Sequence, residues 1–104
     1  MGIPSNEFGG QEPGTSEEIR QQLTTIHDVT FPILDKTELN GPNACELAKF
    51  LRVNTWALQD IAGIKTVAWS WSKWLVDENG HVVAYHELHE DPSTFENEIC
   101  EMLD

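Results

Sequence analysis

The segment from residue 69 to residue 86 constrains the fold of this 104-residue chain more than any other. It reads WSWSKWLVDENGHVVAYH, and its side chains alternate in character from Trp69 to Asp77. Such alternation predicts a strand whose two faces lie in different surroundings. Asn79-Gly80 then predicts a tight hairpin turn into a second strand over residues 81–86. The chain is therefore expected to fold around an antiparallel hairpin.

Three helices and one further strand are expected around this hairpin. The first helix, over about residues 16–26, starts at a capping box in which Thr15 is the cap and Glu18 lies three positions later. The second begins near Asn43, and the third takes Ser93 as its cap. Residues 29–34 predict a strand at an edge or a bulge, because Pro32 has no N–H to donate. The apolar helix faces are Ile19, Leu23 and Ile26; Ala44, Leu47, Ala48 and Leu51; and Phe95, Ile99, Met102 and Leu103. Together these elements predict one α/β domain over residues 1–104.

The charge balance restricts the possible partners. The chain has 18 acidic and 6 basic residues, a net charge of -12, which repels phosphate backbones and argues against nucleic acid and anionic membranes. No apolar run is long enough to predict a membrane span, and no signal peptide is evident, so a cytoplasmic location is expected. Two cysteines, Cys45 and Cys100, are expected to be reduced thiols.

A longer stretch near the start carries a resemblance. Residues 3–14 read IPSNEFGGQEPG, which resembles the second signature of the glutathione peroxidase family, and Thr15 to Ile19 continue the match. Further matching stretches are Phe31-Pro32, residues 40–44, residues 49–51 and residues 69–77, followed by Gly80 and Val82-Val83. The resemblance implies a thioredoxin-like α/β fold. It also implies that the chain corresponds to the C-terminal two-thirds of that fold, incomplete at the N-terminus.

The resemblance assigns chemistry to three residues. In the family a thiolate or selenolate attacks the peroxide O–O bond, and thiols then reduce the oxidised product. Glutamine, tryptophan and asparagine side chains donate hydrogen bonds to this nucleophile. Gln11 and Trp69 fall on the first two positions, and Ser70 falls on the asparagine position with a shorter reach. Hydroperoxide and a thiol reductant, glutathione or thioredoxin, are the implied substrates; no prosthetic cofactor and no metal are implied.

The nucleophile itself does not align with any residue of this chain. Ser5 stands where many relatives have a cysteine, but that cysteine is not the one that attacks peroxide. Cys45 is expected in the first turn of a helix, where the dipole could activate a thiol, yet it falls outside the family site, as does Cys100. Thr24 lies close to the place of the resolving cysteine used by thioredoxin-dependent relatives. We therefore expect little or no peroxidase turnover from this chain.

Other interpretations remain open at this stage. A non-catalytic interaction module built on the same scaffold is the main alternative, and a truncated gene product with no role of its own is another. Loss of a central strand would leave sheet surface to be covered by a protein partner or by self-association. The HELHE run at residues 86–90 is interpreted as a solvated strand end, because its histidines are three apart rather than four. The tryptophan cluster is interpreted as core packing plus one site residue.

Overall fold

The computed structural model describes residues 1–61, 63–64, 66–68 and 70–103. It divides into two compact units, Met1–Ala48 and Lys49–Asp104, which are described separately. Their union into the single domain expected over residues 1–104 stays a prediction. Among the described residues, no helix has both the length and the apolarity to cross a membrane.

The first unit contains helix α1, Ser16–His27, where the capping box predicted it. The Oγ1 atom of Thr15 accepts a hydrogen bond from the Glu18 N–H at 3.2 Å, which satisfies one of the otherwise unpaired donors of the first turn. At the other end Asp28 adopts a left-handed conformation (φ 53°), and its N–H donates to the Leu23 carbonyl. The predicted apolar face packs only in part: Ile19 is almost fully buried and Leu23 is half-buried, whereas Ile26 is exposed.

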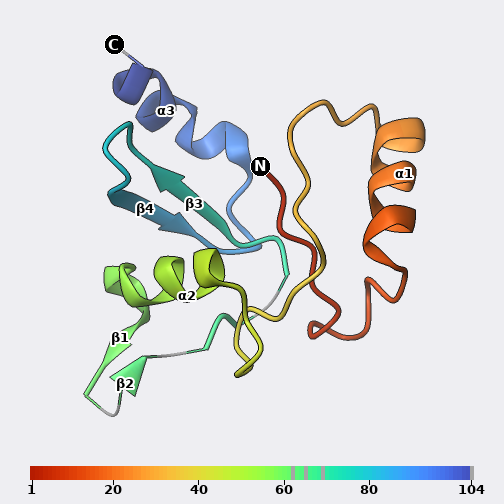
Figure 1. Ribbon diagram of the computed structural model, residues 1–104. Helices are drawn as coiled ribbons and strands as arrows, with labels where there is room; N and C mark the ends of the chain where they lie inside the picture. The colour runs from red at the N-terminus through yellow and green to blue at the C-terminus, as the bar shows by residue number, and fades with distance from the viewer. Residues whose placement is uncertain (62, 65, 69, 104) are drawn as a thin grey trace. The chain divides into compact units, whose positions relative to one another are not determined.

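The strand predicted over residues 29–34 is wrong. The segment contributes only one isolated parallel bridge, between Gly2 and Ile33. The Gly2 N–H donates to Pro32 O at 2.8 Å, and the Leu34 N–H donates to Gly2 O at 2.9 Å. Regular pairing does not extend because Pro32 has no N–H, and the Ile33 carbonyl accepts from Arg20 Nε at 2.9 Å. In Figure 1 the N-terminal segment runs beside this connection.

Helix α2, Glu46–Val53, confirms the second predicted helix. Its inward face is the predicted one, since Ala48 and Leu51 are buried, and Ala44 is buried just before the helix. Cys45 precedes the helix rather than lying in its first turn, and the Cys45 N–H donates to Thr37 Oγ1 at 3.0 Å. The buried apolar side chains of the first unit are Phe8, Ile19, Leu39, Ala44 and Ala48.

The second unit contains two antiparallel strand pairs. A single 3-10 turn, η1 (Trp56–Leu58), leads into β1, Gln59–Asp60, which pairs with β2, Gly63–Ile64; this short pair was not expected. The predicted hairpin is confirmed as β3, Lys73–Val76, and β4, Val82–His86. Its register places Trp74 opposite Tyr85 and shifts by one residue beside Val76. Figure 1 shows the two pairs on opposite sides of α2.

The turn of the β3–β4 hairpin contains three residues, Glu78 to Gly80. The Asp77 N–H donates to His81 O at 2.9 Å, and the Gly80 N–H donates to Asp77 O at 3.1 Å. Gly80 has φ 84°, a conformation that glycine adopts without steric cost. The Asp77 carboxylate accepts from the backbone N–H groups of His81 and Asn79, and these bonds lower the pKa of Asp77.

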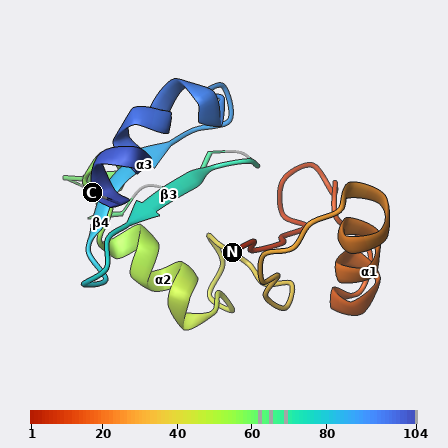
Figure 2. The same cartoon turned by 90° about the horizontal axis from the view of Figure 1, so that it is seen from above.

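The C-terminal helix begins differently from the prediction. A 3-10 turn, η2 (Pro92–Phe95), precedes α3, Glu96–Leu103, and the cap is Asp91 rather than Ser93. The Asp91 Oδ1 atom accepts from Ser93 N at 2.9 Å and from Ser93 Oγ at 2.7 Å. Pro92 suits the first helical position, so the turn begins two residues earlier than predicted. Phe95 is buried, whereas Met102 and Leu103 are exposed. Figure 2 shows α3 beside the β3–β4 sheet.

Candidate functional site

The loop that carries Gln11 is shaped by its own residues. Gly9 and Gly10 have φ values of 65° and 63°, and a side chain at Gly10 would meet open space, so the backbone conformation itself favours glycine there. The Asn6 Oδ1 atom accepts from the Glu12 N–H at 3.0 Å, and Phe8 is buried beneath the loop. Gln11 lies at the exposed end of this turn, and its N–H donates to Phe8 O at 3.4 Å. The Gln11–Phe8 and Glu12–Asn6 hydrogen bonds thus fix the backbone at and directly after Gln11.

A second segment of the same unit fixes this loop. The Lys36 ammonium donates to Gly14 O at 2.5 Å and to Glu12 O at 3.3 Å. The Glu7 carboxylate accepts from the backbone N–H groups of Leu39 and Asn40. Such charge-assisted bonds are stronger than neutral ones. Between the segments lies an open polar groove of about 470 Å³, lined by Ser5, Asn6, Glu7, Lys36, Thr37, Glu38 and Asn43.

The other predicted donors belong to the second unit. Ser70 is half-buried in a bend, and Trp69 lies outside the described residues. The predicted alternation from residue 69 to 77 fails at Trp71, which has φ 62° and a side chain that is 72% exposed. A strand cannot continue through a left-handed residue, so β3 starts only at Lys73. Gln11 and Ser70 therefore lie in different units, and their convergence on one site stays a prediction.

Aromatic packing anchors the strand that follows Ser70. The Trp74 Nε1–H donates to Thr55 Oγ1 at 2.9 Å, and the buried Thr55 hydroxyl in turn donates to Leu51 O. The Trp74 and Tyr85 rings lie 5.1 Å apart at 50°. The Tyr85 hydroxyl is 3.3 Å from Ser72 Oγ, and burial raises the pKa of Tyr85. Beside this pair is a cavity of about 60 Å³, lined by Ala68, Ser72, Tyr85, Glu87, Leu88 and His89.

The two cysteines differ in exposure. Cys45 is half-buried ahead of α2, and Cys100 is exposed on α3. Both are free thiols. Ser5 Oγ accepts from the Glu7 N–H at 3.3 Å, a local turn contact. Thr24, near the expected place of a resolving cysteine, donates its hydroxyl to Arg20 O at 2.8 Å within α1.

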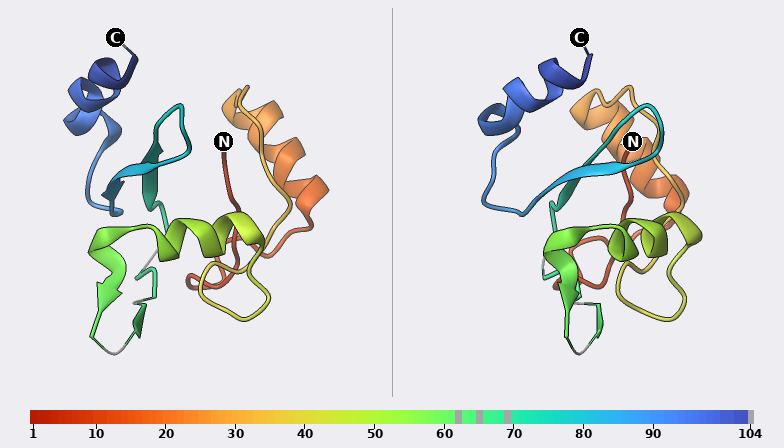
Figure 3. Two further views of the ribbon diagram at one scale, coloured as in Figure 1. Left: turned by 60° about the vertical axis from the view of Figure 1, so that its left-hand side comes forward. Right: turned by 90° about the vertical axis from the view of Figure 1, so that its left-hand side faces the viewer.

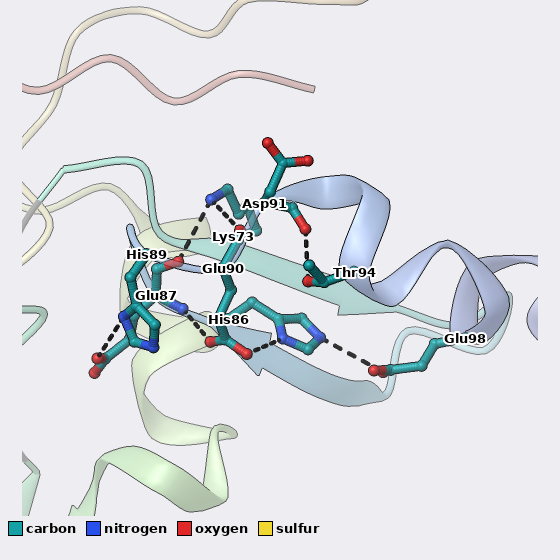
Figure 4. A network of polar contacts seen from close by, with 8 residues as sticks. All are labelled: Lys73, His86, Glu87, His89, Glu90, Asp91, Thr94 and Glu98. Carbon is teal, nitrogen blue, oxygen red and sulfur yellow. Dashed lines mark hydrogen bonds and ion pairs between the residues drawn. The ribbon is translucent and has the colours of Figure 1, made fainter.

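The HELHE run is only partly the solvated strand end that the sequence predicted. His86 closes β4 and its side chain is just 12% exposed, whereas the His89 side chain is 77% exposed. The His86 ring stacks on Phe95 with centroids 4.0 Å apart and planes 4° from parallel. Its Nδ1 atom lies 2.8 Å from Glu90 Oε1, and its Nε2 atom lies 3.5 Å from Glu98 Oε2 (Figure 4). His86 therefore joins β4 to the C-terminal helix.

Further contacts hold the Glu90 carboxylate in this network. Its Oε2 atom accepts from the Glu87 N–H at 2.7 Å, and the Lys73 ammonium donates to Glu90 O at 2.8 Å. The hydrogen bond from His86, followed by the one from Glu87, lowers the pKa of Glu90. The network lacks a metal-ligand arrangement among the residues that the structure describes, since the two carboxylates approach opposite nitrogens of one ring. The four-residue spacing of His86 and Glu90 in the sequence could have indicated their contact, but nothing in the sequence indicates the stacking of His86 on Phe95.

Comparison with known proteins identifies the family. The family model described as glutathione peroxidase matches residues 1–52, which is half of the chain. A probable phospholipid hydroperoxide glutathione peroxidase of Solanum lycopersicum is 39% identical over 99% of this chain and 59% of its own length. The hydroperoxy fatty acid reductase gpx1 of Synechocystis is also 39% identical, over 99% of this chain and 62% of its own.

A solved structure gives the same assignment. The crystal structure of Trgpx in apo form resembles this chain with a TM-score of 0.70 and 26% identity, over 98% of this chain and 55% of that one. The mixed helices and strands together with this likeness show a partial thioredoxin-like fold of the glutathione peroxidase type. The chain thus spans about three-fifths of the length of the curated relatives it matches. On these grounds, this chain belongs to the glutathione peroxidase family.

Proposed function

We propose that this chain carries part of a thiol peroxidase site for the reduction of hydroperoxides. Gln11 and Trp69 are the proposed hydrogen-bond donors to the nucleophile, and Ser70 takes the asparagine position. The observation that carries this proposal is the Gln11 loop, whose two left-handed glycines and Asn6 contact give a defined turn to the stretch that resembles the family signature. Relatives named as phospholipid hydroperoxide and hydroperoxy fatty acid enzymes support lipid hydroperoxides as substrates.

We further propose that residues 1–104 by themselves turn over hydroperoxide little or not at all. Cys45 and Cys100 are the cysteines of the sequence, and neither falls on the nucleophile position of the family. A serine such as Ser5, with no adjacent base, is a poor substitute because its hydroxyl is not ionised at neutral pH. Two donors without a thiolate stabilise no anion and carry out no peroxide cleavage.

A peroxidase assay tests this proposal. Consumption of hydrogen peroxide and of a lipid hydroperoxide is followed with glutathione or thioredoxin supplied, beside an intact relative. The expected result is no turnover above the uncatalysed background. Clear turnover that Cys45→Ser abolishes and Cys100→Ser leaves intact would overturn the proposed inactivity and identify Cys45 as the nucleophile.

A longer gene product would change the interpretation. Sequencing the transcript upstream of the codon for Met1 reveals whether a cysteine or selenocysteine loop is encoded there. If it is, the peroxidase function belongs to that longer protein, with glutathione or thioredoxin as the reductant. Cytoplasmic location is likewise a proposal, and two relatives are named chloroplastic and mitochondrial.

The second candidate is a non-catalytic interaction module on the same scaffold. It is favoured by the large apolar side chains that remain exposed, among them Trp56, Ile61 and Leu103. Such a module would bind a protein partner or a second copy. Co-purification of a stoichiometric partner with no peroxidase activity would support it, and a chain that stays monomeric and alone would count against it.

A further inference from the structure

The C-terminal helix α3 has little apolar packing of its own. None of its residues, Glu96–Leu103, is buried, and Ile99 is only half-buried. Figure 3 shows η2 and α3 following β4 at the end of the chain, with the β3–β4 pair between α3 and α2. The buried anchor lies just before the helix, in Phe95 of η2, whose ring stacks on the ring of His86. The position of α3 therefore depends strongly on the contacts that His86 makes.

The two ring nitrogens of His86 face carboxylates from two different elements. Nδ1 lies 2.8 Å from Glu90 Oε1, in the connection that follows β4, and Nε2 lies 3.5 Å from Glu98 Oε2, in α3. The Nε2 atom is buried and makes no hydrogen bond with the residues that the structure describes. The Glu90 contact is local in the sequence, so the Glu98 contact is the one that links the histidine charge to the helix.

Only the protonated ring suits both carboxylates. A neutral imidazole carries one N–H, whereas the imidazolium carries two. With a single proton on Nδ1, the lone pair of Nε2 faces the Glu98 carboxylate. With a single proton on Nε2, the lone pair of Nδ1 faces Glu90, which stays ionised because its hydrogen bond with His86 lowers its pKa. The geometry therefore couples one bound proton to the contact between β4 and α3.

The charged groups around His86 come from three elements (Figure 4). Lys73 of β3 lies opposite His86 in the register, and its ammonium donates to two carbonyl oxygens of the connection at 2.8 and 3.4 Å. The connection and α3 contribute the others: Glu87, His89, Glu90, Asp91 and Glu98. Four carboxylates thus lie near the ring against one ammonium, so these surroundings hold no excess of positive charge to oppose a proton there.

We propose that His86 is a pH-sensitive latch for the C-terminal helix. In the protonated state its ring pairs with Glu98 and holds α3 on the β3–β4 sheet, and loss of the proton releases the helix. Histidine is the side chain that ordinarily changes charge between about pH 5 and 8. The docked state binds the proton more tightly than the released state, so docking is strongest on the acid side of this range and weakens as the pH rises. The inference goes beyond peroxidase chemistry and does not depend on it.

Amide hydrogen exchange followed by mass spectrometry tests the proposal on the full chain. Exchange of α3 is compared at each pH with that of an unstructured peptide of residues 87–104, so that the intrinsic pH dependence of exchange cancels. Protection of α3 is expected to fall about fivefold from about pH 5.5 to about pH 8, the scale of one ion pair. Helix α2 contains no histidine, and its protection is expected to stay constant.

Two variants remove the latch in different ways. Glu98→Gln replaces the carboxylate with an amide, which can donate a hydrogen bond to the neutral Nε2 atom. His86→Phe keeps an aromatic ring for the stack on Phe95 but carries no proton. In both variants the protection of α3 is expected to become independent of pH over this range. Glu98 is half-exposed, so its substitution leaves a folded chain in which the proposal is tested even where His86→Phe does not fold.

His89→Phe and Glu101→Gln are the matched controls. His89 is a histidine of the same run with a side chain that is 77% exposed, and Glu101 is an exposed carboxylate of the same helix. Both variants are expected to keep the wild-type pH dependence, and circular dichroism checks that each chain folds. Protection of α3 that is constant or rises with pH in the wild type overturns the proposal. So does a pH dependence that survives Glu98→Gln, or one that His89→Phe abolishes.

Discussion

At the scale of single residues, Trp71 has the least favourable backbone conformation of the segment that carries the predicted donors. A bulky residue at φ 62° costs about 1–2 kcal/mol relative to the ordinary helical region, and glycine avoids most of that cost. Because the Trp71 side chain is largely exposed, little packing is lost on its removal. We expect Trp71→Gly to raise the free energy of unfolding by about 0.5–1 kcal/mol, measured by urea titration followed by circular dichroism.

Trp71→Ala is the matched control for this change. Alanine removes the same indole but keeps a Cβ, so the left-handed conformation keeps its cost. The alanine variant should therefore be no more stable than the wild type. Equal stabilities for the glycine and alanine variants would show that the backbone at residue 71 is not strained.

Glu90 makes the free energy of unfolding depend on pH, and the lowered pKa of this residue fixes the sign of that dependence. Its pKa is lowered in the folded state, chiefly by the hydrogen bond with His86. The stabilisation is therefore present above the ordinary glutamate pKa of about 4.3 and is lost as the pH falls through the lower folded value. We expect Glu90→Gln to be less stable than the wild type at neutral pH, and the difference to shrink as the pH falls below the ordinary glutamate pKa, in urea titrations at several pH values.

Glu101→Gln is the control for Glu90→Gln, because Glu101 is an exposed carboxylate on α3. It removes one negative charge without touching the His86 network. A difference between Glu90→Gln and wild type that stays constant from neutral to acid pH would contradict the linkage between Glu90 and His86. The Asp77 and Asp91 pKa values are lowered by backbone bonds from His81 and Ser93, so they shift wild-type stability in the same direction.

At the scale of elements, the sequence predicts the helices and strands whose sequence patterns lie within or directly beside the element itself. α1 follows from its cap and its apolar spacing, and the β3–β4 hairpin follows from alternation and from Asn79-Gly80. The segment at residues 29–34 has β-branched and aromatic residues, but its backbone partner is only the short stretch from Gly2 to Pro4, so it forms a bridge and no strand. The β propensity of a segment does not reveal whether a neighbouring strand is present to pair with it.

Thr55 links two elements, the end of α2 and strand β3. Its hydroxyl accepts from Trp74 Nε1 and donates to Leu51 O, and the side chain is fully buried. Thr55→Val keeps the shape but leaves a partly buried indole N–H without its acceptor, which costs about 1–3 kcal/mol. We expect this loss in the free energy of unfolding, measured by chemical denaturation.

A double-mutant cycle separates the hydrogen bond from the packing around it. Trp74→Phe removes the donor, so Thr55→Val in that background no longer leaves an unpaired N–H and should cost less than in the wild type. Additive losses in the double variant would mean that the bond contributes nothing beyond side-chain packing. Tyr85, whose ring lies against Trp74, is unchanged throughout and reports any rearrangement of the pair.

At the scale of the whole molecule, the candidate site was predicted from the resemblance and not from physical pattern alone. The loop of Gln11 has the turn chemistry its glycines imply, since Gly9 and Gly10 both adopt positive φ. The burial of His86 could not be predicted, because it depends on the ring of Phe95, nine residues later, which stacks on the His86 ring. Contacts between elements distant in sequence arise from packing, and local periodicity does not contain them.

The net charge of -12 makes a prediction that belongs to the molecule as a whole. With three acidic residues for every basic one, repulsive pairs outnumber attractive ones, and folding brings them together. Salt screens both kinds of pair, but exposed ion pairs such as Arg20–Asp35 each contribute at most about 1 kcal/mol. We therefore expect the urea midpoint to rise as sodium chloride is increased from low to high concentration, because relief of repulsion exceeds the loss of ion pairs. Arg20→Gln removes the Arg20–Asp35 pair and should show a salt-dependent rise at least as large. A midpoint that falls with salt in the wild type, and falls less in Arg20→Gln, would mean that specific ion pairs outweigh the general repulsion.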